Sequence, residues 1–113
     1  MAIQKWSDNI WVLQLSDDRI FNEEVEAAQG QIEQEQTTPD VVVDLSGVEH
    51  LNSSNLSQLL KLRKTMIDHD ARLRLASPPD KVWALFLTTG LDKVFDFKSD
   101  TSTALADLQI GSK

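Results

Sequence analysis

The run from Val41 to Leu45, near the middle of the chain, limits the fold more than any other feature. Three valines stand in a row, and apart from Asp44 the run shows no alternation between apolar and polar residues. A strand of this type is apolar on both faces, which is typical of a parallel sheet covered by helices. The run therefore predicts an α/β fold.

Strand and helix patterns alternate on either side of this run. Strands are predicted at Ile3–Trp6, Ile10–Leu15, Val41–Leu45, Arg72–Ala76 and Val94–Phe97. Helices are predicted to begin at the capping residues Asn22, Ser53, Ser77 and Thr101 or Ser102. The first two strands form an N-terminal hairpin, and the later β-α-β crossovers imply a mixed, mostly parallel sheet.

The segment after Asn55 has the strongest helical pattern. Its expected apolar stripe is Leu56, Leu59, Leu60, Arg63, Met66 and Ile67. Gln58 is expected on the opposite, solvent-facing side. In the following helix, Ser77 is expected to cap the start, Pro78 to occupy the first position and Gly90 to end the helix.

The length of 113 residues predicts one domain spanning residues 1–113. The chain has no cysteine, so a disulfide scaffold, a thiolate metal site and a cysteine nucleophile are excluded. No apolar run is long enough to span a membrane, and Met1 to Lys5 does not begin a signal peptide. We therefore expect a cytoplasmic protein with no membrane partner.

The charge is concentrated between Asp17 and Asp40. This window holds eight acidic residues and one basic residue, so its charge of −7 equals the net charge of the whole chain. An acidic helix face disfavours phosphate backbones, and we expect no nucleic-acid partner. A solvated helix surface is the simplest interpretation of the window.

The residues offer little support for catalysis. Glycine occurs only at positions 30, 47, 90 and 111, so there is no glycine-rich phosphate loop, and there is no Gly-x-Ser-x-Gly motif. Asp68-His69-Asp70 lacks the spacing of a metal site and is interpreted as a polar turn. The three tryptophans are interpreted as packing residues. We therefore predict no catalytic residue, no metal and no cofactor.

The tetrapeptide Asn52-Ser53-Ser54-Asn55 is the unusual feature of the chain. It lies between a buried strand and a strong helix, where α/β sheets place functional loops. A purely structural interpretation is also open, in which Ser53 caps the helix and Asn52 forms a local turn.

Two segments resemble the STAS domain, the fold of bacterial anti-sigma factor antagonists. The first is Val41 to Leu60, VVVDLSGVEHLNSSNLSQLL, and the second runs from Leu73 to Phe97, including Ser77-Pro78 and the stretch Thr89 to Phe95. Together they imply a STAS-like fold with an N-terminal hairpin over nearly the whole chain.

The resemblance also implies a function. In the family, the partner is an anti-sigma factor that is also a serine kinase, and its kinase domain is a histidine-kinase-like ATPase. This partner phosphorylates the first serine of an Asp-Ser-Ser-Gly motif. Phosphorylation breaks the complex, and a serine phosphatase resets it. Carried over, the phosphoacceptor is Ser53, with Ser54 as the alternative. The partner-binding residues are Asn52, Ser53, Ser54, Asn55 and Ser57.

Two departures leave a second function open. Asn52 replaces the family's aspartate, and Asn55 replaces its glycine. These changes favour a STAS scaffold or binding module without phosphate control, whereas the retained Ser53-Ser54 pair favours a working switch. A small-ligand-binding domain for a nucleotide or lipid is a third interpretation, and an enzyme ranks last.

Overall fold

The computed structural model describes residues 3–16 and 18–110; Asp17, one of the acids of the acidic window, lies outside them. The elements in chain order are β1 (Ile3–Lys5), β2 (Ile10–Gln14), α1 (Asp18–Gln34), β3 (Asp40–Asp44), α2 (Ser53–Asp68), β4 (Leu73–Ala76), α3 (Asp80–Thr89), the 3-10 helix η1 (Leu91–Lys93), β5 (Phe97–Lys98) and α4 (Thr101–Ile110). The predicted order of strands and α-helices is confirmed.

The five strands form one sheet in the order β1-β2-β3-β4-β5. The β1-β2 pair is antiparallel, as expected for the N-terminal hairpin, and the other pairs are parallel. In the centre, Val41 pairs with Trp11 on one side and with Leu73 on the other. The prediction of an α/β fold with a mixed, mostly parallel sheet is confirmed.

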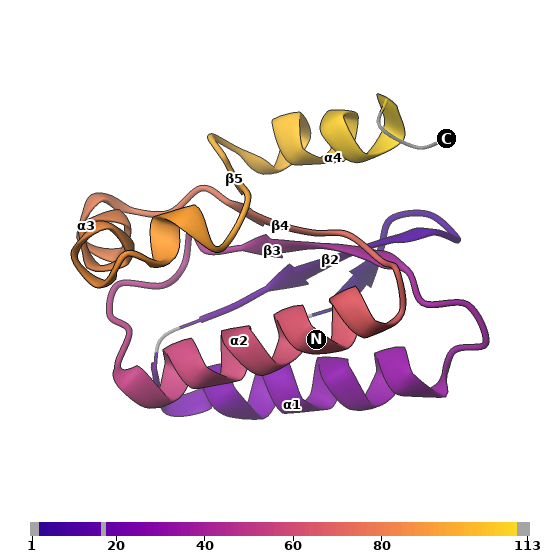
Figure 1. Cartoon of the computed structure of the whole chain (residues 1–113), viewed down its shortest axis with the longest axis horizontal. Coiled ribbons are helices and arrows are strands. Elements are labelled where there is room, and N and C mark those ends of the chain that lie inside the picture. The colour runs from indigo at the N-terminus through magenta and orange to yellow at the C-terminus, as the bar shows by residue number, and fades with distance from the viewer. Residues whose placement is uncertain (1–2, 17, 111–113) are drawn as a thin grey trace.

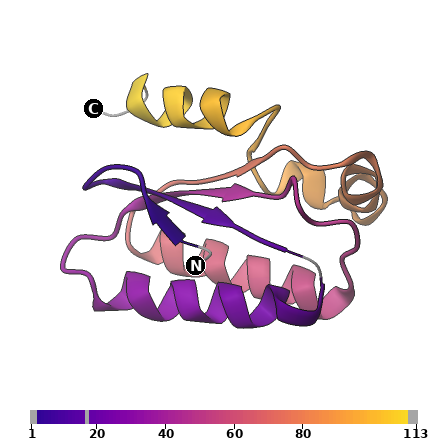
Figure 2. The ribbon, with the colours of Figure 1, turned by 180° about the vertical axis from the view of Figure 1, so that it is seen from behind.

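Helices cover both faces of the sheet (Figures 1 and 2). Helices α1 and α2 lie side by side on one face, α4 lies alone on the other, and α3 lies near one end of the strands. The side chains of the three valines of β3 alternate between these two faces. Val41 and Val43 belong to the core under α1 and α2, and Val42 belongs to a smaller cluster under α4. Burial on both faces explains why this strand does not alternate.

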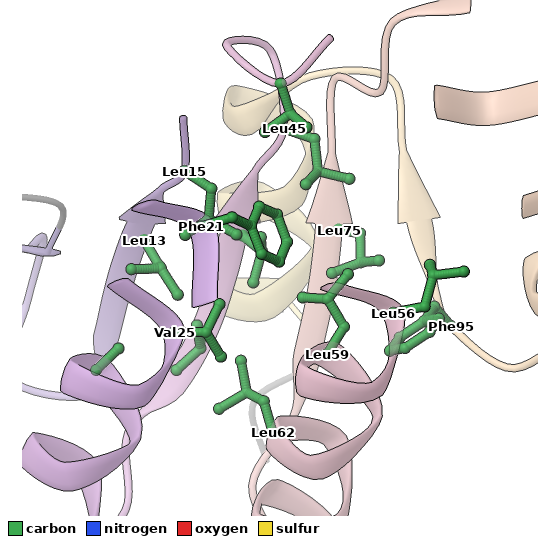
Figure 3. Close-up of a cluster of buried hydrophobic side chains, with 14 of the residues drawn as sticks. Leu13, Leu15, Phe21, Val25, Leu45, Leu56, Leu59, Leu62, Leu75 and Phe95 are labelled. Carbon is green, nitrogen blue, oxygen red and sulfur yellow. The ribbon is translucent and has the colours of Figure 1, made fainter. Parts of the chain in front are cut away.

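The larger core fills the space between the sheet and helices α1 and α2 (Figure 3). Phe21 and Val25 of α1 and Leu59 of α2 are fully buried there. The stripe predicted for α2 is partly wrong, because Leu60 and Ile67 are 37% and 52% exposed. The missed residue is Leu62, which is fully buried. Helix α2 packs against α1 and shares the larger core with the strands, so part of its buried face is turned toward α1.

Gln58 also shows this rotation of α2. It does not lie on a solvent face opposite the core, as the pattern predicts. Its side-chain amide donates to Glu26 Oε2 of α1 at 3.0 Å, and Gln58 Oε1 is buried without a hydrogen bond among the described residues.

Several predicted helix starts are wrong. Helix α1 begins at Asp18, so Asn22 lies inside it. Helix α3 begins at Asp80 with Pro79 at the N-cap. Ser77, the predicted cap, lies ahead of the helix with a positive φ of 59°. Helix α4 is capped by Asp100, whose carboxylate accepts from the Thr103 backbone N–H at 2.7 Å. Many polar residues can cap a helix, and the exit of the preceding strand selects among them.

The end of α3 is as expected, and the strand after it is displaced. Gly90 adopts the left-handed conformation, with φ 78°, at the C-cap of α3. The predicted strand Val94–Phe97 is shorter and later, because Leu91–Lys93 forms a 3-10 turn and only Phe97–Lys98 pair with β4. Phe95 instead packs edge-on against Phe86 of α3, with ring centroids 5.9 Å apart.

Candidate functional site

The Asn52–Asn55 tetrapeptide lies where β3 leads into α2. Strands β2, β3 and β4 are parallel, so their carboxyl ends meet at one edge of the sheet. Helices α1, α2 and α3 follow these strands in the chain. The tetrapeptide therefore occupies the edge at which sheets of this type place functional groups.

Two asparagines cap the helix reciprocally. Asn52 Oδ1 accepts from the Asn55 backbone N–H at 2.9 Å, and Asn55 Oδ1 accepts from the Asn52 backbone N–H at 2.9 Å. This arrangement is a capping box, which satisfies two backbone donors at the helix start. The prediction that Ser53 is the N-cap is wrong. Asn52 is the N-cap and Ser53 is the first helical residue.

Asn22 of α1 connects this cap to the neighbouring helix. Its side-chain carbonyl accepts from Asn55 Nδ2 at 2.9 Å, and its side-chain NH₂ donates to Ser54 Oγ at 2.7 Å. Asn55 is only 1% exposed, so the bond to Asn22 satisfies a side-chain amide that water cannot reach. Asn22, Ser54, Asn55 and Asn52 therefore form one continuous network, called here the amide network.

The sequence pattern does not indicate Asn22 as a site residue, because an asparagine followed by acidic residues is typical of a helix cap. Asparagine is unfavourable inside a helix. Because α1 begins at Asp18, Asn22 lies inside the helix, and an asparagine at such a position indicates a specific hydrogen-bonding role.

Ser53 lies at the edge of the amide network and takes no part in it. Its side chain is exposed, and its hydroxyl makes no hydrogen bond within the described residues. Consecutive helical residues are rotated by about 100° around the axis. Because Ser54 faces α1, Ser53 points away from α1, on the outward face that also carries Ser57, Lys61 and Lys64. All four residues on this face are exposed.

The electrostatic setting of Ser53 favours an added negative charge. The first turn of α2 contains no acidic residue. A helix N-terminus carries a partial positive charge and has backbone N–H groups available to an anion. The chemical group best accommodated on Ser53 is therefore an anionic one such as a phosphate.

The residues of the predicted polar turn make local contacts at the end of α2. His69 Nδ1 lies 2.8 Å from the Thr65 carbonyl, to which it donates, and Asp68 pairs with Lys64 at 3.0 Å. Within residues 3–16 and 18–110, no group of three or more acidic or histidine side chains is placed to hold a metal. Trp11 is buried in the core and Trp83 packs edge-on against Phe97, with ring centroids 5.0 Å apart. Trp6 differs from the interpretation as a packing residue, because it is 41% exposed.

A groove of about 230 Å³ lies at the other end of α2, beside the first residues of β4. Arginines and apolar side chains line it, but each guanidinium group is already engaged. The contacts are Arg63 with the Val94 carbonyl at 3.1 Å, Arg72 with Asp40 at 2.9 Å and Arg74 with Asp107 at 2.7 Å. Two of the three guanidinium charges, those of Arg72 and Arg74, are therefore compensated by carboxylates, whereas the contact of Arg63 is to a neutral carbonyl.

The STAS domain family matches the sequence over residues 5–104. This chain belongs to the STAS domain family. A search of curated proteins by sequence found no match. In the part of the chain that the structure describes, none of the helices has the length and apolar character needed to cross a membrane.

Solved structures with a similar fold include proteins described as anti-sigma factor antagonists. A candidate anti-sigma factor antagonist from Thermotoga maritima aligns with a TM-score of 0.80 at 18% identity, covering 91% of this STAS domain and 90% of that chain. A serine-to-glutamate variant of RsbS from Moorella thermoacetica aligns over 100% of both chains, with a TM-score of 0.80 and 17% identity. The anti-sigma factor antagonist SpoIIAA in its unphosphorylated form aligns with a TM-score of 0.79 at 16% identity, covering 98% of this STAS domain and 96% of that chain. At these identities the likeness establishes the fold.

Proposed function

We propose that this STAS domain is an anti-sigma factor antagonist that binds an anti-sigma factor with serine kinase activity and is switched by phosphorylation of Ser53. One observation carries the proposal. Ser53 presents an exposed hydroxyl, free of hydrogen bonds within the described residues, at the first position of a 16-residue helix. The STAS fold and its similarity to SpoIIAA, of which a phosphorylated form has also been solved, support this role.

The switch acts by charge at the surface. A phosphate on Ser53 brings close to two negative charges to the outward face of α2, and the helix N-terminus stabilises negative charge by about 0.3–1 kcal/mol. The domain itself therefore tolerates the modification. The partner loses contact through charge repulsion and steric blocking, and a serine phosphatase restores the unmodified form.

The binding surface is the start of α2. Asn52, Ser53, Ser54 and Ser57 are exposed and can contact a partner directly. Asn55 is 1% exposed, so the proposal gives it a supporting role in holding the surface in shape. The domain needs no catalytic residue or cofactor of its own for this function, and we assign its action to the cytoplasm.

The second candidate is a STAS scaffold that binds its partner without phosphate control. The amide network favours this candidate, because Asn52 and Asn55 close a neutral cap around the helix start. Both candidates use the same surface and differ in whether a kinase modifies Ser53.

Phosphosite mapping combined with a binding measurement separates the two candidates. The protein is incubated with ATP and the histidine-kinase-like serine kinase encoded nearest to it, and binding to that kinase is measured by calorimetry. We expect phosphate on Ser53, none on Ser53→Ala, and binding at least tenfold weaker for Ser53→Glu. Tight binding without phosphate would select the scaffold. Binding that is unchanged in both Ser53→Glu and Ser57→Glu would contradict the proposed surface.

A further inference from the structure

We propose that Asn22 directs phosphoryl transfer to Ser53 by holding the hydroxyl of the adjacent Ser54. This inference rests on the proposed switch at Ser53. Ser53 and Ser54 are consecutive, both are exposed, and both lie in the first turn of α2. Exposure and position in the chain therefore do not explain why a kinase would modify one serine and leave the other.

Hydrogen bonding separates the two serines. Ser54 Oγ accepts from Asn22 Nδ2 at 2.7 Å, whereas Ser53 Oγ has no partner in residues 3–16 and 18–110. The bond to Ser54 spans two helices, so it fixes the Ser54 side chain against α1. Ser53 is turned away from α1 and has no such restraint.

Asn22 is itself held in place. Its carbonyl accepts from Asn55 Nδ2 at 2.9 Å, and Asn55 is 1% exposed. Turning Asn22 away from Ser54 would leave this buried amide without a partner, which is costly. Asn55 stands where the STAS motif has glycine, and glycine has no side chain with which to restrain Asn22. The restraint on Ser54 therefore belongs to this chain's own version of the motif.

The chemistry of transfer favours the unrestrained hydroxyl. The serine oxygen attacks the γ-phosphorus of a nucleoside triphosphate held by the kinase, and its proton passes to a base of the kinase. The bond from the γ-phosphorus to the bridging oxygen breaks, and the nucleoside diphosphate leaves. On Ser54, the Asn22 amide occupies one acceptor position of the attacking oxygen, and a phosphate there would have to displace Asn22 from its place between the helices. On Ser53 nothing needs to move.

A double-mutant cycle tests the restraint without a kinase. Ser53→Glu and Ser54→Glu are each made in the wild-type and in the Asn22→Ala background, and unfolding is followed in urea. We expect Ser54→Glu to raise the unfolding constant at least about fivefold more in the wild-type background than with Asn22→Ala. We expect Ser53→Glu to have the same effect in both backgrounds. If Asn22→Ala does not fold, Asn22→Ser replaces it. Equal effects of Ser54→Glu in the two backgrounds would overturn the inference.

Phosphosite mapping tests the directing role. With the kinase and ATP, we expect phosphate on Ser53 alone in the wild type and on both serines in Asn22→Ala. In the Asn22→Ala/Ser53→Ala double variant we expect phosphate on Ser54. Gln29→Ala is the matched control, because Gln29 donates to Thr65 Oγ1 at 2.9 Å elsewhere along the same pair of helices. This control should be modified only on Ser53.

The outcomes distinguish this inference from the proposed function. Phosphate confined to Ser53 in Asn22→Ala, or phosphate on Ser54 in the wild type, would overturn the directing role and leave the switch standing. Absence of phosphate on the wild type would overturn the switch and the directing role together, even if the cycle showed that Asn22 holds Ser54.

Discussion

The two faces of the sheet are covered by different kinds of contact. On one face, α1 and α2 enclose the larger apolar core and are joined to each other mainly by bonds between neutral side chains, Asn22 with Ser54 and Asn55 and Gln29 with Thr65. One carboxylate also joins them, because Glu26 accepts from Gln58. On the other face, α4 covers a small cluster and is held by charged groups. Arg72 donates to the Leu108 carbonyl at 2.8 Å, and Arg74 donates to Asp107 at 2.7 Å.

This difference predicts two kinds of stability. A large apolar core with neutral hydrogen bonds depends little on pH or salt, whereas contacts made by carboxylates depend on both. The proposed switch lies on the neutral side. The contacts described around Ser53 are made by the uncharged residues of the amide network, and the ion pair of the same helix, Lys64 with Asp68, is exposed and lies near its other end.

The largest expected effect comes from the core on the α1 and α2 face. Leu59 is fully buried between α2 and the sheet. Leu59→Ala should lower the free energy of unfolding by about 2–5 kcal/mol, because it removes buried apolar contacts and leaves a cavity. Lys61→Ala, on the exposed face of the same helix, should change it by less than about 0.5 kcal/mol. Equal effects of the two variants in a urea titration would show that the face of α2 is wrongly assigned.

The next effect concerns the charged side of the sheet. Arg74 is 15% exposed and contacts Asp107 at 2.7 Å and Asp96 at 3.3 Å. Arg74→Ala should lower the free energy of unfolding by about 1–3 kcal/mol, because hydrogen bonds between charged groups are lost. Lys64→Ala is the control, since the Lys64–Asp68 pair is exposed and should contribute no more than about 0.5 kcal/mol. If Arg74→Ala were as stable as Lys64→Ala, the result would contradict the conclusion that ion pairs hold α4 against the sheet.

Loss of the cap should have a slightly smaller effect. Asn55→Ala removes the side-chain bonds to the Asn52 backbone and to Asn22. We expect the free energy of unfolding to fall by about 0.5–2 kcal/mol, the range for loss of a helix cap. Ser53→Ala removes no hydrogen bond within the described residues and should be nearly neutral. Thermal unfolding followed by circular dichroism makes the comparison, and an equal loss in the two variants would contradict the amide network.

The smallest expected effect is a dependence of stability on pH that comes from the α4 side of the sheet. The hydrogen bond from Arg74 lowers the pKa of Asp107 below its ordinary value of 3.8. A lowered pKa in the folded state means that the stabilisation is present above the unfolded value and is lost as the pH falls through the folded value. Stability should therefore decline as the pH falls below about 5, and the decline should be shallower in Asp107→Asn.

The matched control for pH is Asn55→Ala. This variant lowers stability without removing an ionisable group, so its curve should run parallel to that of the wild type. Melting temperatures across the pH series provide the measurement. A decline as steep in Asp107→Asn as in the wild type would mean that other carboxylates carry the acid sensitivity.

Local sequence was sufficient to predict the element order and the position of the Asn52–Asn55 tetrapeptide between β3 and α2. The valines of β3 indicate burial on both faces by composition alone, and Gly90 ends α3 because it can adopt a left-handed conformation. The change of pattern after Asn52 predicts that a helix starts there with Ser53 at its N-terminus, although the N-cap is Asn52. These features depend on neighbours within a few residues, which the sequence shows directly.

Tertiary contacts decided which residues do what within those elements. Leu60 and Ile67 have the spacing of core residues, yet the packing of α2 against α1 leaves them exposed and buries Leu62. The bond from Asn22 to Ser54 joins residues 32 positions apart. No local pattern predicts it, because helix–helix packing brings the two side chains within hydrogen-bonding distance. The sequence determined that two serines stand at the start of α2, and only the packing of α1 beside them decided which hydroxyl is held and which is free.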